Sequence, residues 1–204
     1  MKSTHILRIP NFFPQAQALR NEFDQHFANP KQATHDRFVW DYWYVEDQYN
    51  MIRTMAENVF SEKFLSQFQE NLVQFGKTHL GCDAITPPWV SYYVDGCSQQ
   101  LHADVPHGPW AYVYSLTLWN KKEFSGGETL LLKPETLNYW ANFENMYGIE
   151  MNQLTTKIPA LFNQLLVFDP RIPHGVVPVH GTRDPLKARL VIHGWFTHPY
   201  PVIE

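Results

Sequence analysis

The stretch WVSYYVDGCSQQLHAD, residues 89–104, decides the fold. It holds two candidate strands, the apolar run 89–94 and the more polar run 99–104, and an aspartate and a glycine lie between them. Runs of β-branched and aromatic residues bounded by turn residues are typical of strands. The same texture continues along the chain and predicts further strands at residues 111–119, 128–132, 165–168, 175–179 and 189–197. Many short strands punctuated by Gly, Pro and Asp indicate a β sandwich or barrel.

The first 80 residues have a different pattern and are expected to be mostly helical. Apolar residues recur with helical spacing after Pro14 and again in residues 49–59. A third stripe follows Ser61, which is placed to cap a helix that runs to Gly76. Short extended pieces are expected at residues 5–9 and 38–45. The predicted fold class is therefore mainly β with N-terminal helices, an α+β arrangement.

A chain of 204 residues is long enough for one well-buried domain and short for two. We expect a single domain, residues 1–204, with a helical support region at 1–80 and a β core at 87–198. Residues 133–159 interrupt the core with an insert that is too long for a simple turn and too apolar for a plain linker. We expect this insert to be a lid.

The charge pattern argues against several classes of partner. The net charge is -4, and the lysines and arginines are scattered, so the basic surface of a nucleic-acid-binding protein is not expected. No apolar stretch approaches the roughly 20 residues that span a bilayer. Cys82 and Cys97 form neither a CxxC nor a CxxCH motif, which favours a reducing compartment. We therefore expect a cytoplasmic protein that acts on a small molecule or a peptide, with its oligomeric state left open.

A candidate metal site begins with His102 and Asp104, because residues two apart on a strand point to the same face. This pair is weak by itself, since chance gives about 0.4 His-x-Asp pairs in a chain of this composition. His174 adds to it, because it follows an apolar strand and a turn that contains Pro170 and Pro173. Two imidazoles and one carboxylate occupy one face of a six-coordinate iron and leave three positions open. A structural zinc site would instead close its coordination, usually with thiolates.

Two arginines are candidates for binding the carboxylate of a cosubstrate near this metal. Arg183 lies in the turn-like stretch Gly181-Thr182-Arg183-Asp184-Pro185, where Asp184 could neutralise its charge. Arg189 opens an apolar strand that could hold a guanidinium rigidly inside a barrel. We prefer Arg189 and keep Arg183 as the alternative.

Taken in order, these motifs resemble the iron and 2-oxoglutarate oxygenase superfamily, and most closely its prolyl-hydroxylase-like branch. The resemblance covers residues 89–196, about half of the chain, and rests on five ordered pieces. They are Val90-Ser91-Tyr92-Tyr93, His102-Ala103-Asp104, residues 114–120 with Ser125-Gly126-Gly127-Glu128-Thr129, His174-Gly175-Val176-Val177-Pro178-Val179, and residues 189–195. The long spacing from His174 to Arg189 and the long insert depart from the family pattern.

The resemblance implies a double-stranded β-helix, or jelly roll, in which His102, Asp104 and His174 bind Fe(II). It also implies O2 as the oxidant and 2-oxoglutarate as a cosubstrate that chelates the iron while its distal carboxylate meets Arg189. One of three tyrosines is expected to add a hydroxyl donor to the cosubstrate: Tyr92, Tyr112 or Tyr114.

The implied reaction hydroxylates an unactivated C–H bond and releases succinate and CO2. Halogenating members of the family lack the carboxylate ligand, so Asp104 favours hydroxylation. We expect a small amino-acid-like metabolite as the substrate, because the chain is compact. The alternatives are a prolyl-type hydroxylase that acts on a protein, a non-catalytic sensor that binds 2-oxoglutarate and iron, and a cupin-type metalloenzyme that uses no cosubstrate.

Three further polar residues have simpler interpretations. His107 is expected to be a loop histidine exposed to water. His193 is expected to be a core or surface imidazole without a binding role. Asp169 is expected to fix the turn before His174 through hydrogen bonds to the backbone rather than to contact the metal.

Overall fold

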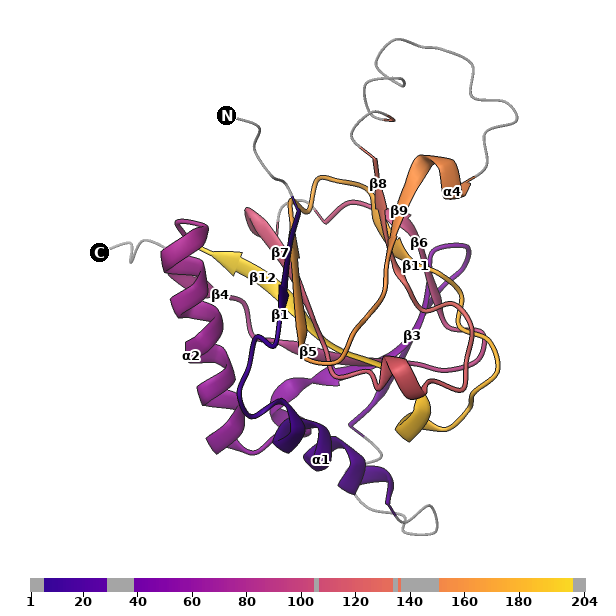
Figure 1. Ribbon diagram of the computed structural model, residues 1–204, viewed down its shortest axis with the longest axis horizontal. Helices are drawn as coiled ribbons and strands as arrows, with labels where there is room; N and C mark the ends of the chain where they lie inside the picture. The colour runs from indigo at the N-terminus through magenta and orange to yellow at the C-terminus, as the bar shows by residue number, and fades with distance from the viewer. Residues whose placement is uncertain (1–5, 29–38, 105–106, 134–135, 137–150, 200–204) are drawn as a thin grey trace.

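The computed structural model describes residues 6–28, 39–104, 107–133, 136 and 151–199. In this part of the chain, twelve strands form one connected sheet, and the paired strands are antiparallel. The sheet curls on itself, so that a larger and a smaller wall face each other (Figure 1). This curled arrangement creates the space in which the candidate site lies.

The strands follow each other across the sheet in a fixed order. In the larger wall the order is β1 (Ile6–Pro10), β10 (Gln164–Phe168), β7 (Trp110–Ser115), β12 (Arg189–Thr197), β5 (Trp89–Tyr93) and β3 (Tyr49–Met55). The smaller wall continues with β6 (Ser98–His102), β11 (His174–Val176), β8 (Thr129–Leu132) and β9 (Thr155–Ile158). Two strands lie beside this path: β2 (Asp41–Val45) pairs with β3, and β4 (Ala84–Ile85) pairs with β12.

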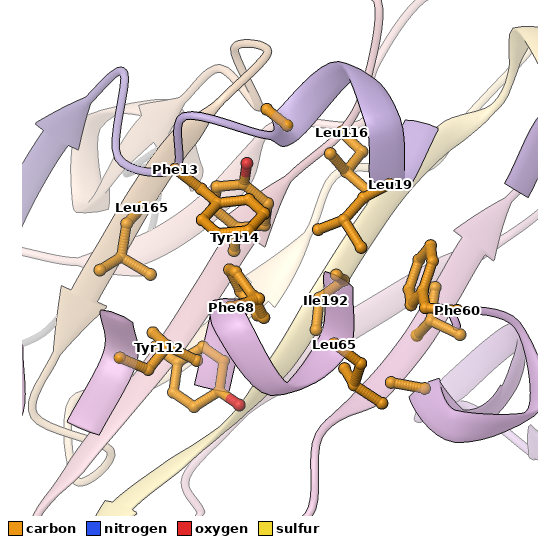
Figure 2. Packing of buried hydrophobic residues seen from close by; sticks show 14 of the residues in the cluster. Phe13, Leu19, Phe60, Leu65, Phe68, Tyr112, Tyr114, Leu116, Leu165 and Ile192 are labelled. Atoms are coloured by element: carbon orange, nitrogen blue, oxygen red, sulfur yellow. The ribbon is translucent and has the colours of Figure 1, made fainter. Parts of the chain in front are cut away.

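Two helices, α1 (Ala16–Phe27) and α2 (Glu62–His79), cover the outer face of the larger wall (Figure 1). Their apolar stripes pack on β5, β7, β10 and β12, and Figure 2 shows Phe68 of α2 between Tyr112 and Tyr114 of β7. Full burial of such a side chain stabilises the fold by roughly 1.5–3 kcal/mol. No helix in the described residues is both long and apolar enough to cross a membrane. The helices therefore back the larger wall and leave its other face to the cavity.

The predicted β fold with supporting helices is confirmed, but the helix predicted at residues 49–59 is wrong. This segment forms β3 and then a single 3₁₀ turn, Ala56–Asn58. Met51 and Thr54 point to opposite faces of β3 and both are buried. Because both faces of the strand are covered, apolar and polar residues do not alternate, and the remaining apolar spacing imitates a helix.

The expected lid, residues 133–159, lies mostly outside the described residues. Its described part contains two elements that the sequence pattern did not predict, α4 (Met151–Leu154) and β9. Strand β9 pairs with β8 along its whole length and so extends the smaller wall. A lid function for this insert stays a prediction.

Candidate active site

A cavity of about 440 Å³ lies between the two walls of the sheet. Side chains alternate across a strand, so every second residue of the larger wall points into this space. The strands β3, β5 and β12 contribute Met51, Arg53, Trp89, Tyr93, Arg189, Val191, His193 and Trp195 to its lining. The volume falls within the range of about 300–1,000 Å³ that is usual for small-ligand sites.

The three predicted metal ligands meet on the smaller wall. His102 ends β6 and His174 begins β11, and the two residues are direct partners in the pairing of these strands. Asp104 follows β6, and its backbone N–H donates to the Pro170 carbonyl oxygen at 3.0 Å. One possible ligand atom from each of the three residues lies within 4.8 Å of the other two. The register of two strands thus brings distant segments of the sequence to one point.

Hydrogen bonds orient both imidazoles toward the carboxylate. The Nδ1 atoms of His102 and His174 lie 2.8 Å and 2.9 Å from the carbonyl oxygens of Gln100 and Ile172. Because a carbonyl oxygen only accepts, each Nδ1 carries the hydrogen, and Nε2 of the neutral ring presents a lone pair. Those Nε2 atoms lie 3.5 Å and 3.3 Å from the Asp104 carboxylate oxygens. Lone pairs that converge in this way repel one another, and a cation between them would relieve the repulsion, so these three residues could hold a metal ion.

The protonation states at these residues also suit a metal site. Burial lowers the pKa of His102, so its neutral, ligating form is favoured. Burial alone would raise the pKa of Asp104, but the hydrogen bond and charge of His174 and the charge of His102, which act when these rings are protonated, outweigh burial and lower it. The carboxyl group is therefore anionic at neutral pH.

Arg189 is buried in the same cavity, where its side chain is 1% exposed. Its Nη2 donates to Thr129 Oγ1 at 3.2 Å, and its Cζ lies 4.5 Å from the ring centroid of Tyr93. Its Nε and Nη1 are buried without a hydrogen-bond partner among the described residues. Burial lowers the pKa of Arg189, although the charge of Tyr93, a side-chain hydrogen bond with Tyr93 and the charge of Glu128 oppose the shift. A buried guanidinium with unused donors is suited to binding a ligand carboxylate through two parallel hydrogen bonds.

The alternative arginine, Arg183, lies elsewhere. Its side chain is 90% exposed, and its Nε is 3.9 Å from a carboxylate oxygen of Asp95. It does not line the cavity that holds the three predicted ligands. The geometry favours Arg189 as the cation of the site.

Two of the predicted tyrosines point away from the cavity. The ring of Tyr92 packs against Trp40 in the layer between sheet and helices, with the ring centroids 4.9 Å apart. The hydroxyl of Tyr114 lies in the same layer and donates to Asn163 Oδ1 at 2.9 Å (Figure 2). The expectation that either tyrosine donates to a ligand in the cavity is corrected, because strand parity directs both side chains toward the helices.

Tyr112 borders the cavity, but its ring packs against Phe196 on the helix side. The tyrosine that the sequence reasoning missed is Tyr93, which lies directly opposite Arg189 in the pairing of β5 and β12. Its hydroxyl donates to Gln99 Oε1 at 3.2 Å, inside the cavity. Tyr92 and Tyr93 are adjacent on a strand and must point to opposite faces. The motif Val90-Ser91-Tyr92-Tyr93 therefore contained one tyrosine for each face of the sheet.

The histidine expected to have no binding role, His193, faces the cavity on the same side of β12 as Arg189. Its Nε2 is hydrogen-bonded to Ser91 Oγ at 2.8 Å. Burial and the charges of Arg53 and Arg189 lower its pKa to about 4, so it is neutral at physiological pH. His193 therefore lines the cavity, contrary to the expectation from the sequence, because it lies four residues after Arg189 and residues four apart on a strand share a face.

The expectations for Asp169 and His107 agree with the structure. Asp169 Oδ1 accepts a hydrogen bond from the backbone N–H of Arg171 at 3.0 Å, within the turn before His174. His107 is exposed, although its ring lies 4.5 Å from that of Trp195 at the edge of the cavity. Asp169 thus shapes the turn that positions a predicted ligand.

Comparison with known protein families identifies the chain. Residues 88–197 match the model of a family described as the 2OG-Fe(II) oxygenase superfamily, and this match covers more than half of the 204 residues. The chain belongs to this superfamily. No curated protein matches the oxygenase by sequence. As a member of the family, the oxygenase uses Fe(II), 2-oxoglutarate and O2.

Solved structures share the fold of the oxygenase. A prolyl-4-hydroxylase from Pseudomonas putida is 16% identical, with a TM-score of 0.64 over 96% of this chain and 94% of that one. A prolyl hydroxylase from Trichoplax adhaerens, solved with a peptide of hypoxia inducible factor, is 19% identical, with a TM-score of 0.62 over 96% and 84% of the two chains. A viral collagen prolyl hydroxylase from Paramecium bursaria Chlorella virus-1 is 16% identical, with a TM-score of 0.57 over 95% and 96%. At these identities the likeness concerns the fold.

The residues of the oxygenase fit the cofactor and cosubstrate of its family. The converging lone pairs of His102, Asp104 and His174 match a divalent iron, which accepts imidazole and carboxylate ligands. The unpartnered donors of Arg189 match a carboxylate of 2-oxoglutarate.

We expect Gly175→Ala to weaken both the fold and Fe(II) binding of the oxygenase. A Cβ at this position would lie 2.6 Å from Gln99 O and 3.0 Å from Gln100 O, so β11 would have to move away from β6 and carry His174 with it. Overpacking of this kind costs about 1–3 kcal/mol. Thermal unfolding and anaerobic Fe(II) titration measure the two effects.

A control for this variant is Gly81→Ala, since a Cβ at Gly81 would meet no atom within 4 Å. Its φ of +68° makes alanine locally strained, so some stability is lost while Fe(II) affinity stays the same. If Gly175→Ala bound Fe(II) as well as the unmodified oxygenase, the close contact between β11 and β6 would not set the position of His174.

Proposed function

We propose that His102, Asp104 and His174 bind Fe(II), that Arg189 binds the distal carboxylate of 2-oxoglutarate, and that the oxygenase hydroxylates a small amino-acid-like metabolite. In the balanced reaction, one oxygen atom of O2 enters the C–H bond of the substrate. The other enters succinate, which forms from 2-oxoglutarate as CO2 is lost. The observation that carries the proposal is the presence of three converging ligand atoms and an unpartnered buried guanidinium in one cavity.

The protein residues bind and orient the reactants. Arg189 fixes one end of 2-oxoglutarate, with Tyr93 beside it, while the other end of the molecule faces the three iron ligands. The bound iron supplies the oxygen chemistry. The indole rings of Trp89 and Trp195 line the remaining cavity and limit the access of water to it.

The size of the cavity supports a small substrate. A volume of about 440 Å³ is near the lower end of the usual range for ligand sites, and 2-oxoglutarate takes part of it. The space left beside the iron ligands suits a metabolite or one side chain.

A second candidate function is the hydroxylation of a peptidyl residue. It is supported by the two structural relatives described as a prolyl hydroxylase bound to a peptide and a collagen prolyl hydroxylase. Such an enzyme would admit one side chain to the cavity and leave the rest of its substrate outside.

The test is to incubate the oxygenase with Fe(II), 2-oxoglutarate and a cell extract that has been separated by size. We expect products with one added oxygen atom in the low-mass fraction and stoichiometric succinate release. An identical incubation with Asp104→Ala serves as the control and should give neither. Oxygenated products found in the protein fraction alone would contradict the metabolite proposal and support the peptidyl alternative.

A further inference from the structure

A second arginine, Arg53, lines the cavity and has no role in the family chemistry described above. It lies on β3, on the same face as Met51, and its neighbour across the strand pair is Ser91 of β5. Its guanidinium is stacked between two indole rings, with Cζ 2.8 Å from the ring centroid of Trp43 and 4.2 Å from that of Trp89. Two aromatic faces fix the orientation of a cation and remove water from it.

Among the described residues no carboxylate forms an ion pair with Arg53, although the charge of Asp41 acts on it. Its Nε is buried without a hydrogen-bond partner in the described part of the chain. Asp41 lies opposite Arg53 in the β2–β3 pairing, but it is exposed and forms no ion pair with it among the described residues. Burial lowers the pKa of Arg53 to about 10, which still leaves the group charged at neutral pH. A partly desolvated cation without a partner is costly unless a ligand supplies an anion.

Arg53 and Arg189 are separate binding points. Strand β5 lies between their strands, and along it Arg53 faces Ser91 whereas Arg189 faces Tyr93. Ser91 and Tyr93 are about 6.6 Å apart along β5. Arg53 lies on the strand to one side of β5, and Arg189 lies on the strand to the other side. The two guanidinium groups therefore reach the cavity from different strands and from different positions along β5.

A count of charges in the loaded cavity leaves room for another anion. With neutral histidines, Fe(II), Arg189 and Arg53 carry one positive charge more than Asp104 and doubly charged 2-oxoglutarate can neutralise. A substrate carboxylate placed against Arg53 would offset this charge locally in a site of low dielectric, provided that any ammonium group of the same molecule lies away from the two guanidinium groups.

We infer that Arg53, held between Trp43 and Trp89, binds a free carboxylate of the substrate, so that the oxygenase acts on a free amino acid rather than on a residue inside a peptide. This inference rests on the proposed function. The planar guanidinium gives two parallel hydrogen bonds to the carboxylate, and this anchor orients the rest of the molecule toward the iron ligands.

The experiment uses the anaerobic complex of the oxygenase with Fe(II) and 2-oxoglutarate, whose weak visible charge-transfer band reports on ligands near the iron. The probes are the twenty protein amino acids and the carboxamide of each. We expect at least one free acid to perturb the band, and its carboxamide to bind at least about a hundredfold more weakly. Arg53→Gln should show the same loss for the acid, and Arg53→Lys, which keeps the charge without the planar fork, a smaller one.

Arg183→Gln is the matched control, because Arg183 is exposed and lies outside the cavity, and it should bind the acid normally. Thermal unfolding of each variant separates loss of binding from loss of fold. The inference is overturned if acid and amide bind equally, if no acid binds, or if folded Arg53→Gln keeps the affinity for the acid. The band before any probe is added tests the proposed function separately: its absence in the unmodified protein would reject that function, whereas a normal band with no response to acids rejects the role of Arg53 alone.

Discussion

Asp104→Ala is expected to remove iron binding and turnover almost completely. The substitution removes the carboxylate of Asp104, whose oxygens lie 3.5 Å from Nε2 of His102 and 3.3 Å from Nε2 of His174. Only the two imidazoles are then left to bind the metal. Loss of a group that only supports a metal ligand costs about 10–100-fold in metal affinity, so loss of the ligand itself should cost at least about a hundredfold. Anaerobic titration with Fe(II) measures the affinity, and succinate release measures the turnover.

The control for this substitution is Asp83→Ala, which removes an exposed carboxylate outside the cavity lining. This variant should bind Fe(II) and release succinate as the unmodified oxygenase does. Unchanged iron affinity in a folded Asp104→Ala variant would be incompatible with the proposed metal centre.

Arg189→Met is expected to weaken 2-oxoglutarate binding by about 100-fold or more without lowering the stability of the ligand-free protein. Removal of one partner from a buried charged contact costs about 2–5 kcal/mol of binding energy, which corresponds to this loss. In the ligand-free protein, by contrast, the substitution removes the buried guanidinium of Arg189, whose Nε and Nη1 have no hydrogen-bond partner among the described residues. Replacing such a charge by an apolar side chain of similar size is neutral or stabilising. Equilibrium binding of 2-oxoglutarate and thermal unfolding measure the two quantities.

Two other arginines provide opposite controls for Arg189. Arg20 is equally buried, but its guanidinium donates to the Leu116 carbonyl oxygen and pairs with the half-exposed Asp24, so Arg20→Met should lower stability by about 1–3 kcal/mol. Arg183→Ala should change neither stability nor 2-oxoglutarate affinity to a measurable degree, since exposed ion pairs contribute little. If Arg183→Ala weakened 2-oxoglutarate binding and Arg189→Met did not, the cosubstrate assignment would be wrong while the metal assignment would survive.

The sequence motifs and the family resemblance pointed to the three residues that the fold brings together at the candidate metal site, which lie at strand ends and turns. His102 ends β6, Asp104 lies beyond the strand and donates its backbone N–H to the Pro170 carbonyl oxygen, and His174 follows a turn marked by prolines. Their convergence depends on the pairing of β6 with β11, which a pattern of single strands does not specify. The resemblance to a family supplied the expectation that the three residues converge, and the structure gives the strand pairing that brings them together.

Strand parity explains the errors in the rest of the site. Tyr92 and Tyr93 are equally suited to a strand, and only the backing of the larger wall by α1 and α2 decides that Tyr92 is outside and Tyr93 inside the cavity. Arg53 was missed for a related reason, because β3 is covered on both faces and its apolar spacing resembled a helix. A segment predicted to be a supporting helix therefore turned out to contribute a cation to the cavity.

The central claim is that one cavity holds Fe(II) and 2-oxoglutarate together, and anaerobic absorption spectroscopy of the purified oxygenase tests it most directly. Addition of Fe(II) and 2-oxoglutarate should produce a weak visible charge-transfer band that requires both components. The band should be absent in Asp104→Ala and should need much more 2-oxoglutarate in Arg189→Met. Absence of the band in the folded, unmodified oxygenase at saturating Fe(II) and 2-oxoglutarate would contradict the claim.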